Sequence, residues 1–152
     1  MLLMIPHIRT KTICVKSEAA CEFKVKEGAA AKTVTARDLL ARTVFYKVGH
    51  HGSGNATLRA GLSAMTNPDL VAAVPTDQKF ASEKQGWDMP ARKLEPALRK
   101  QTRGRVLYAD PGKPSIREKN PEGISSASWN KFLQSVKGGG PDDLFVEFHV
   151  EL

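Results

Sequence analysis

The chain contains only two cysteines, Cys14 and Cys21, and six residues separate them. That spacing matches neither a CxxC redox motif nor a zinc-ribbon pair, so we expect two free thiols rather than a disulfide. Long apolar runs are missing as well, because runs such as residues 70–75 are far too short to cross a bilayer. The basic residues near the amino terminus follow the apolar ones, which is the reverse of a secretory leader. We therefore expect a cytoplasmic protein with no membrane association.

Histidine is also scarce, and this restricts the metal chemistry of the chain. There are four histidines: His7, His149 and the adjacent pair His50 and His51. A catalytic zinc ion needs about three protein ligands, so one copy of the chain offers few imidazoles for a complete site. His7 is interpreted as a solvated residue and His149 as a structural one.

Positive charge predominates, but the lysines and arginines do not form long runs. The formal net charge is +7 at pH 7, and the sequence pI is about 9.6. An anionic partner is therefore consistent with the composition. Because acidic residues are scattered among the lysines and arginines, a solvated basic surface is favoured, and a nucleic-acid-binding surface remains the alternative.

Hydrophobic spacing predicts alternating strands and helices after residue 21. The expected strands are residues 22–26, 32–35, 43–48, 70–74, 104–109 and 144–150. The expected helices are residues 36–41, 55–65 and 88–100, and a short helix from residue 128 that holds Trp129, Phe132 and Val136. This alternation indicates an α/β (α+β) fold over residues 22–152, after a poorly defined segment of residues 1–21.

Capping and turn residues set these bounds. Thr35 and Asp38 form a capping-box pattern, and Asn55, Asp88 and Ser128 are predicted to start the three later helices. Polar residues 76–86 are expected to be irregular, and the triple glycine within residues 138–141 is interpreted as a hinge.

The carboxyl end of a predicted strand at residue 74 is followed closely by Asp77. Functional groups of α/β folds often lie at such strand ends. The residue type is equally suited to closing a loop through its own carboxylate, and this second interpretation is favoured.

The most informative segment is residues 43–58, TVFYKVGHHGSGNATL. It leads from a predicted strand into His50 and His51, then into a Gly-Ser-Gly turn and a residue that can cap a helix. Neutral imidazole is the commonest transition-metal ligand, and glycine lets the backbone approach a bound group closely. A glycine-rich turn before a helix can also hold a phosphate group. The alternative is a polar turn whose imidazoles only bond to the backbone.

This order of strand, double histidine, Gly-Ser and helix cap resembles the last metal-binding motif of metallo-β-lactamase-fold hydrolases. The likeness is greatest to the branch of the competence-protein (ComEC-type) hydrolase domains. Residues 55–58 and 68–71 fit the helix and the strand that follow the motif in that family, and the resemblance covers residues 22–152. It implies an αββα sandwich with one or two zinc ions at one edge of its two sheets.

The resemblance also implies the chemistry: a metal-activated water attacks a phosphoester or another anionic ester. It places His51 at the metal-ligand position, with His50 as a neighbouring candidate that could face the substrate instead. Ser53 and Asn55 are assigned to substrate binding. Ser53 as a nucleophile is disfavoured, because the turn lacks the strand pattern of a nucleophile elbow. No residue is assigned the catalytic proton transfers.

The family's main signature, His-x-His-x-Asp-His followed by a further histidine and a bridging aspartate, is missing from the chain. The resemblance therefore covers the C-terminal half of the sandwich, which would expose one sheet face. We expect this chain to be inactive alone, with the other ligands supplied by a missing N-terminal half or by a homodimer. One hypothesis is that residues 1–21 are a diverged or frameshifted start. The alternative functions are a non-catalytic basic module, binding nucleic acid for example, and a truncated product with no activity.

Overall fold

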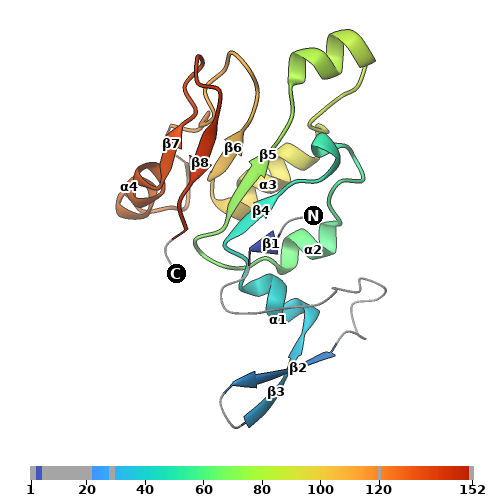
Figure 1. Cartoon of the computed structure of the whole chain (residues 1–152), viewed down its shortest axis with the longest axis vertical. Helices are drawn as coiled ribbons and strands as arrows, with labels where there is room; N and C mark the ends of the chain where they lie inside the picture. Colours follow the sequence, from blue (N-terminus) through green and yellow to red (C-terminus); the bar gives the residue numbers. More distant parts are fainter. Residues whose placement is uncertain (1–2, 5–21, 28–29, 120, 151–152) are drawn as a thin grey trace.

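Three parallel strands form the centre of the computed structural model, which describes residues 3–4, 22–27, 30–119 and 121–150. They are β4 (Phe45–Lys47), β5 (Val71–Val74) and β6 (Val106–Tyr108), and they lie side by side in chain order. A two-residue strand, β1 (Leu3–Met4), pairs antiparallel with β4 at the edge of this sheet (Figure 1). The sheet therefore has the order β1-β4-β5-β6.

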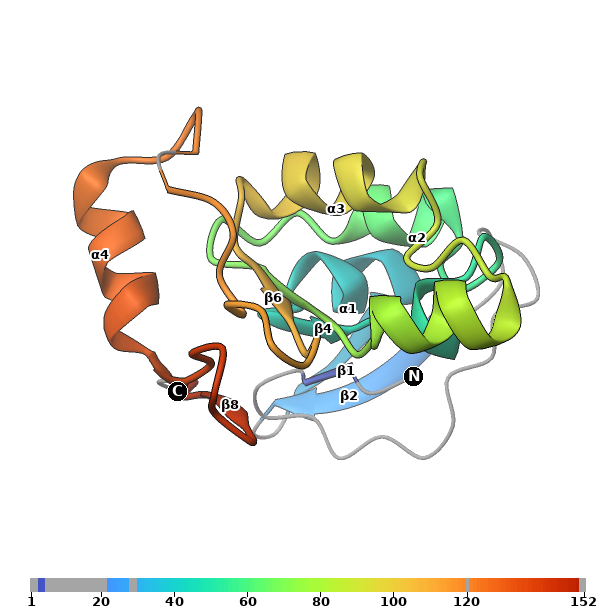
Figure 2. The same ribbon diagram turned by 90° about the horizontal axis from the view of Figure 1, so that it is seen from above.

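Two helices connect the parallel strands and cover the same face of the sheet. The chain passes from β4 to β5 through α2 (Arg59–Ala64) and from β5 to β6 through α3 (Leu94–Thr102). Figure 2 shows both helices on one side of the strands. Parallel neighbours require such crossover connections, because a tight turn can join only antiparallel strands. The predicted α/β character of this region is confirmed.

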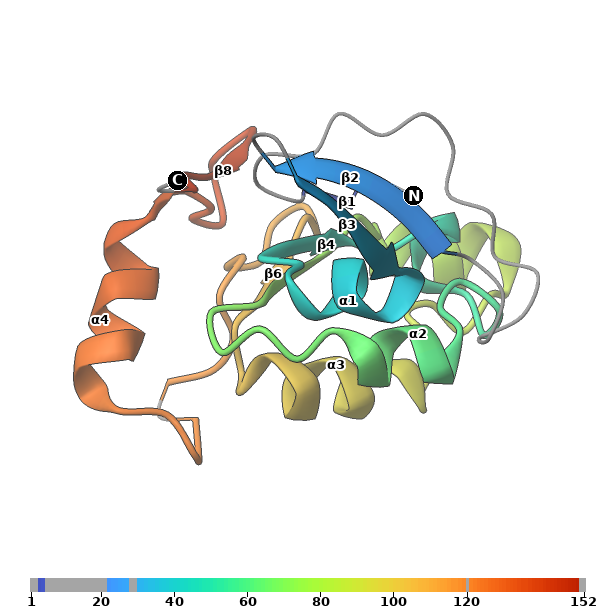
Figure 3. The ribbon, with the colours of Figure 1, turned by 90° about the horizontal axis from the view of Figure 1, so that it is seen from below.

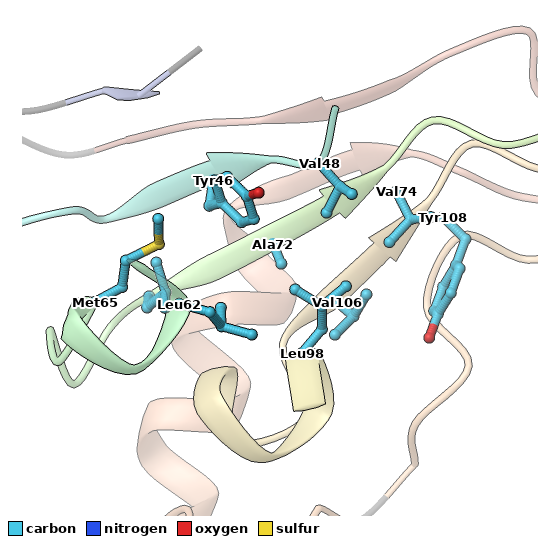
Figure 4. Packing of buried hydrophobic residues seen from close by; sticks show 10 residues of the cluster. Tyr46, Val48, Leu62, Met65, Ala72, Val74, Leu98, Val106 and Tyr108 are labelled. Carbon is cyan, nitrogen blue, oxygen red and sulfur yellow. The ribbon is translucent and has the colours of Figure 1, made fainter. Parts of the chain in front are cut away.

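Residue alternation along the strands divides the interior into two clusters. The first cluster lies between the sheet and helices α2 and α3 (Figure 4), and contains Tyr46, Val48, Leu62, Met65, Leu70, Ala72, Val74, Leu98, Val106 and Tyr108. The second lies on the opposite face and is built around Val71, Leu107, Trp129 and Phe132. Successive strand residues point to opposite faces, so each buried strand contributes to both clusters.

The second sheet face is covered by the C-terminal part of the chain. This part consists of α4 (Ser126–Gln134) and an antiparallel pair formed by β7 (Val136–Gly138) and β8 (Val146–Phe148). The Phe45 and Phe148 rings stack with centroids 5.6 Å apart, which joins the sheet to β8. The expectation of an exposed sheet face is therefore wrong for this face, where Val71 and Leu107 are only 1% and 2% exposed.

An antiparallel hairpin precedes the three parallel strands in the chain. Its strands are β2 (Glu22–Glu27) and β3 (Ala30–Thr35), and it leads directly into α1 (Ala36–Ala41). The hairpin extends away from the central sheet (Figure 1), and Figure 3 shows it leading into α1 when the molecule is seen from below. The predicted capping box is confirmed: the Thr35 hydroxyl oxygen accepts from the Asp38 backbone N–H at 3.2 Å, and the Asp38 carboxylate accepts from the Thr35 N–H at 2.8 Å.

The three later predicted helix starts are all wrong, and Asn55 and Asp88 are the first two. Helix α2 begins at Arg59 with Leu58 in the cap position, so Asn55 does not cap it. Helix α3 begins at Leu94, six residues after Asp88. The residues between Asp88 and Leu94 contact the histidine turn instead, because the Ala91 N–H donates to the Gly52 carbonyl at 2.8 Å.

Four further expectations are corrected in the polar segments and the C-terminal part of the chain. Residues 76–86 contain a helical turn with a π-helix at Phe80–Lys84, rather than an irregular loop. Helix α4 is capped by Ser125, whose hydroxyl accepts from the Ser128 N–H, so Ser128 lies within the helix. Val136 belongs to β7. The expected hinge at residues 138–141 is part of the β7–β8 hairpin, which the Gly139 N–H closes by donating to the Phe145 carbonyl at 2.9 Å.

None of the helices in the described ranges is both long and apolar enough to span a bilayer. Cys14, Cys21 and His7, like the rest of residues 5–21, lie outside the described residues.

Candidate functional site

Polar residues gather at one edge of the sheet, where the three parallel strands end. His50 and His51 follow β4, Thr76 follows β5, and Asp110 follows β6. The carboxyl ends of parallel strands share one edge, and this edge is where open α/β sheets place their functional groups. The first candidate for a site is therefore the histidine turn, with its neighbours after β5 and β6.

The histidine turn has an unusual backbone. His50, His51 and Gly52 have φ angles of 44°, 53° and 80°, so three successive residues lie in the left-handed region. Such angles are costly for residues other than glycine. Two hydrogen bonds close the turn: Gly52 N–H donates to Gly49 O at 2.9 Å, and Ser53 N–H donates to His50 O at 3.0 Å. The turn is therefore held by its own backbone as well as by its surroundings.

Glycine is required at position 52 for a second reason. A Cβ atom at this position would lie 2.9 Å from the Pro90 Cβ and 3.2 Å from the Pro90 Cα. Pro90 is buried, and Ala91 N–H bonds to the Gly52 carbonyl. The segment before α3 thus packs directly against the histidine turn, and it fixes the turn's position relative to the sheet edge.

The imidazole of His51 is oriented by the strand next to it. Its Nδ1 lies 3.0 Å from the Pro75 carbonyl oxygen, and the Thr76 hydroxyl donates to the His51 carbonyl. A carbonyl oxygen only accepts, so the Nδ1 atom must carry the hydrogen. In the neutral ring the lone pair then resides on Nε2. The His51 side chain is exposed, which leaves that nitrogen open to a ligand.

In the part of the chain that the structure describes, no further metal-ligand group joins the neighbouring His50 and His51. Within residues 3–4, 22–27, 30–119 and 121–150, no group of three or more His, Cys, Asp or Glu side chains is arranged to hold a metal ion. His149 lies on the terminal β8 side and forms a 3.4 Å contact with Glu147, away from the turn. The zinc assignment to His51 and His50 therefore stays a prediction.

Ser53 and Asn55, the predicted substrate-binding residues, bond to each other. The Ser53 hydroxyl donates to the Asn55 side-chain oxygen at 2.7 Å. This contact closes the turn after the histidines and leaves the Asn55 amide N–H₂ group as a donor. Behind them, the buried Tyr46 hydroxyl lies 2.7 Å from the Thr57 hydroxyl, and burial raises the pKa of Tyr46. The four side chains order the segment between β4 and α2.

Asp77 has the role that the sequence favoured. Its carboxylate accepts from the Phe80 backbone N–H at 2.8 Å, and so closes the loop at the start of the π-helical segment. The interpretation as a loop cap is confirmed.

Asp110 is the most buried ionisable group of this edge, and sequence reasoning missed it. Its side chain is 2% exposed and accepts from Lys113 at 2.9 Å, from Arg117 at 2.7 Å and from the Gln78 backbone N–H at 2.9 Å. Burial opposes ionisation, but the bonds from Lys113, Gln78 and Arg117 outweigh it and lower the pKa of Asp110. The available signal was its place directly after a buried strand.

A second network lies beside Asp110. The Arg117 guanidinium stands 4.0 Å from the centroid of the Tyr108 ring, and the Tyr108 hydroxyl donates to the Glu95 carboxylate at 2.8 Å. Arg99 bonds to the same carboxylate at 3.2 Å. Burial raises the pKa of Tyr108 to about 12. The hydroxyl therefore remains protonated at neutral pH, and its role here is to join β6 to α3.

Comparison of the chain with protein-family models, curated proteins and solved structures finds no match. The chemistry of this sheet edge is therefore inferred from its own side chains. His51 offers an oriented imidazole nitrogen, His50 a second exposed imidazole, and Lys113 a half-exposed cation paired with Asp110.

Proposed function

We propose that the chain provides one corner of a zinc-dependent hydrolase site of the metallo-β-lactamase type. The observation that carries this proposal is the 3.0 Å contact between His51 Nδ1 and the Pro75 carbonyl. Zinc-binding histidines usually donate their second ring nitrogen to a carbonyl or carboxylate, which sets the tautomer and the ring direction. His51 has this partner, and its Nε2 atom is the nitrogen left for a metal.

The surrounding fold supports the same proposal. A strand, a double-histidine turn, a helix and a second parallel strand follow in order, with the turn at the carboxyl edge of the sheet. The sheet with α2 and α3 on one face corresponds to the β and α layers of half an αββα sandwich, although α4 and the β7–β8 pair cover the face where the second sheet would lie. In this proposal His50 faces the substrate, and Ser53 and Asn55 contact it beside the turn.

The rest of the site would come from outside this chain. Tetrahedral zinc requires four donors at about 2.0–2.3 Å, and His51 supplies one. A separate N-terminal half, or a second copy of the chain, would supply the others. Zinc bound there would lower the pKa of a water molecule and make hydroxide available at neutral pH. The substrate class is a phosphoester or another anionic ester, and the chain alone would be inactive.

The direct test is a zinc titration of the full chain followed by NMR of the histidine rings. We expect zinc to shift the His51 ring signals first, since its Nε2 is oriented for binding. Asparagine tolerates left-handed backbone better than most residues, so His51→Asn and His50→Asn form a matched pair. His51→Asn should abolish the response, and His50→Asn should retain most of it.

Two results of that titration would contradict the proposal. One is an equal response of every histidine ring, which is what nonspecific surface binding produces. The other is an unchanged response in the His51→Asn variant.

A basic nucleic-acid-binding surface is the second candidate function, and one observation favours it. Phe80 and Trp87 are 54% and 49% exposed, and the exposed lysines Lys79 and Lys84 lie in the same segment of the chain. Exposed aromatic rings among cations are typical of single-strand binding surfaces, where bases stack on the rings. Fluorescence anisotropy with a labelled oligothymidine at several salt concentrations tests this. We expect Trp87→Ala to weaken binding, and Leu133→Ala, which removes another exposed apolar side chain, to leave it unchanged.

A further inference from the structure

A small cavity lies at the opposite edge of the sheet from the histidine turn. It has a volume of about 120 Å³ and is bordered by residues at the amino ends of the parallel strands, including Val44, Val71 and Arg105. Helix α4 contributes Phe132 and Lys131, and the segment that ends β8 contributes Phe148 and His149. The cavity therefore lies between the sheet and the C-terminal layer and is partly open to solvent.

Arg105 is the unusual member of this lining. Its side chain is 3% exposed, yet the nearest carboxylate oxygen, on Asp69, is 4.0 Å from its Nη1 atom. Asp69 is itself 71% exposed, so water screens much of its charge. The other two guanidinium nitrogens donate to backbone carbonyls, Nε to Leu70 at 3.3 Å and Nη2 to Pro68.

Buried charges are normally neutralised by a close partner, because desolvation of an isolated ion is costly. Backbone carbonyls accept two hydrogen bonds from Arg105, but they carry only a partial negative charge. The guanidinium stays protonated at every relevant pH. Burial nevertheless lowers the pKa of Arg105, more than the charge of Asp69 restores it. An anion in the adjoining cavity would complete the charge balance of this group.

The other walls restrict the kind of anion. His149 adds an imidazole group to the lining, whereas Phe132 and Phe148 form an apolar wall. A water molecule occupies about 30 Å³ of liquid volume, so the cavity has room for about four non-hydrogen atoms, and its open side lets a slightly longer ligand extend toward solvent. Inorganic phosphate fits this size but offers nothing to the aromatic wall.

We propose that this cavity binds a small carboxylate with a short alkyl chain. The carboxylate oxygens accept from Arg105 on the cationic side, and the alkyl chain of two or three carbons packs against Phe132 and Phe148. Apolar burial of each methylene adds about 0.8 kcal/mol to transfer from water. Affinity should therefore rise from acetate to propanoate to butanoate. The proposal is independent of the histidine turn and of the function proposed for it.

The test is a titration of the full chain with acetate, propanoate, butanoate and phosphate at constant ionic strength. The side-chain Nε–H signal of Arg105 in a nitrogen-15 correlation spectrum reports the site directly. We expect butanoate to shift this signal at the lowest concentration, and to raise the thermal unfolding midpoint in parallel. Acetate and phosphate should need at least several-fold higher concentrations for the same shift.

Variants separate this site from general surface effects. Arg105 is buried and its replacement could prevent folding, so the test uses Ser128, which borders the cavity and is partly buried. Ser128→Leu fills part of the cavity and should weaken butanoate binding several-fold, whereas Ser126→Leu makes the same change on α4 outside the lining and should leave binding unchanged.

Three results would overturn the proposal. The first is an Arg105 signal that does not respond to any of the four anions. The second is equal affinity for phosphate and butanoate, which would show that Phe132 and Phe148 do not contribute to binding. The third is an equal loss of binding in the Ser128 and Ser126 variants.

Discussion

Two adjacent histidines hold left-handed backbone conformations at the end of β4, with φ angles of 44° and 53°. Composition alone could not predict this. The sequence signalled a turn through Gly49 and Gly52, but it did not show that the neighbouring Pro90 would occupy the space beside Gly52. That contact joins residues far apart in the chain. At the residue scale, the local sequence pattern therefore identified the turn but did not determine its backbone conformation.

Gly52→Ala should destabilise the protein by about 2 kcal/mol or more, because it adds a strained backbone residue and a steric clash. The new Cβ would lie 2.9 Å from Pro90 Cβ at a φ of +80°. Gly86→Ala is the matched control, since Gly86 has a φ of +65° with no atom within 4 Å of the added Cβ. It should cost about 1 kcal/mol from backbone strain alone. Urea unfolding measures both, and equal costs would show that the Pro90 contact is unimportant.

The same scale shows why one helix cap was predictable and another was not. Thr35 and Asp38 are three residues apart, and their reciprocal hydrogen bonds depend only on local chain geometry. Asn55 has an equally suitable side chain, but Ser53 donates to its oxygen at 2.7 Å. Its acceptor is thus used within the turn, and the helix begins four residues later at Arg59.

At the scale of elements, Asp110 connects the segments that follow β5 and β6. One carboxylate oxygen accepts from the Gln78 backbone N–H, and the other accepts from Lys113 and Arg117. The neighbouring strands were predictable because they are buried apolar runs. The link between the loops after them was not, since it depends on which strands become neighbours in the sheet.

Asp110→Asn should destabilise the protein by about 2 kcal/mol at pH 7, because it weakens charge-assisted hydrogen bonds to a buried acceptor. The pKa of Asp110 is lowered in the folded protein from its ordinary 3.8. Its ionised form therefore stabilises the fold above pH 4, and this contribution is lost as the pH falls through the lowered pKa. The difference between wild type and Asp110→Asn should accordingly shrink below pH 4.

Urea unfolding at pH 7, 5 and 3 measures this difference. Asp142→Asn, on the exposed β7–β8 turn, is the control and should leave stability nearly unchanged at each pH. A gap between wild type and Asp110→Asn that persists at pH 3 or widens would contradict the assigned role of the carboxylate.

The whole molecule is organised by two clusters on opposite faces of one thin sheet. The sequence predicted mixed strands and helices correctly, because periodicity is a local property. It did not predict that α4 and the β7–β8 pair would cover the second face. That packing brings Phe148 against Phe45, about a hundred residues earlier, at a centroid distance of 5.6 Å. Such long-range pairing is determined by the shape of the complete sheet.

Phe132→Ala should lower the free energy of unfolding by about 3 kcal/mol, since it opens a cavity under α4. Phe132 is 4% exposed and its ring lies 5.0 Å from the Trp129 ring. Leu133→Ala, at the next position of the same helix, removes a side chain that is 40% exposed and should cost less than about 1 kcal/mol. Denaturant unfolding followed by tryptophan fluorescence measures both. Similar costs for the two variants would mean that the second cluster does not hold α4 in place.

The backbone of the histidine turn has a thermodynamic consequence for any ligand that reaches it. Five hydrogen bonds already restrain it: two lie within the turn, and the other three join it to Pro75, Thr76 and Ala91. Its conformational entropy has thus been lost during folding, before a ligand arrives. A ligand of His51 should therefore bind with a smaller entropic penalty than it would to a free peptide of the same residues 43–58. Calorimetry of the protein and of that peptide, with the same ion, would measure the difference.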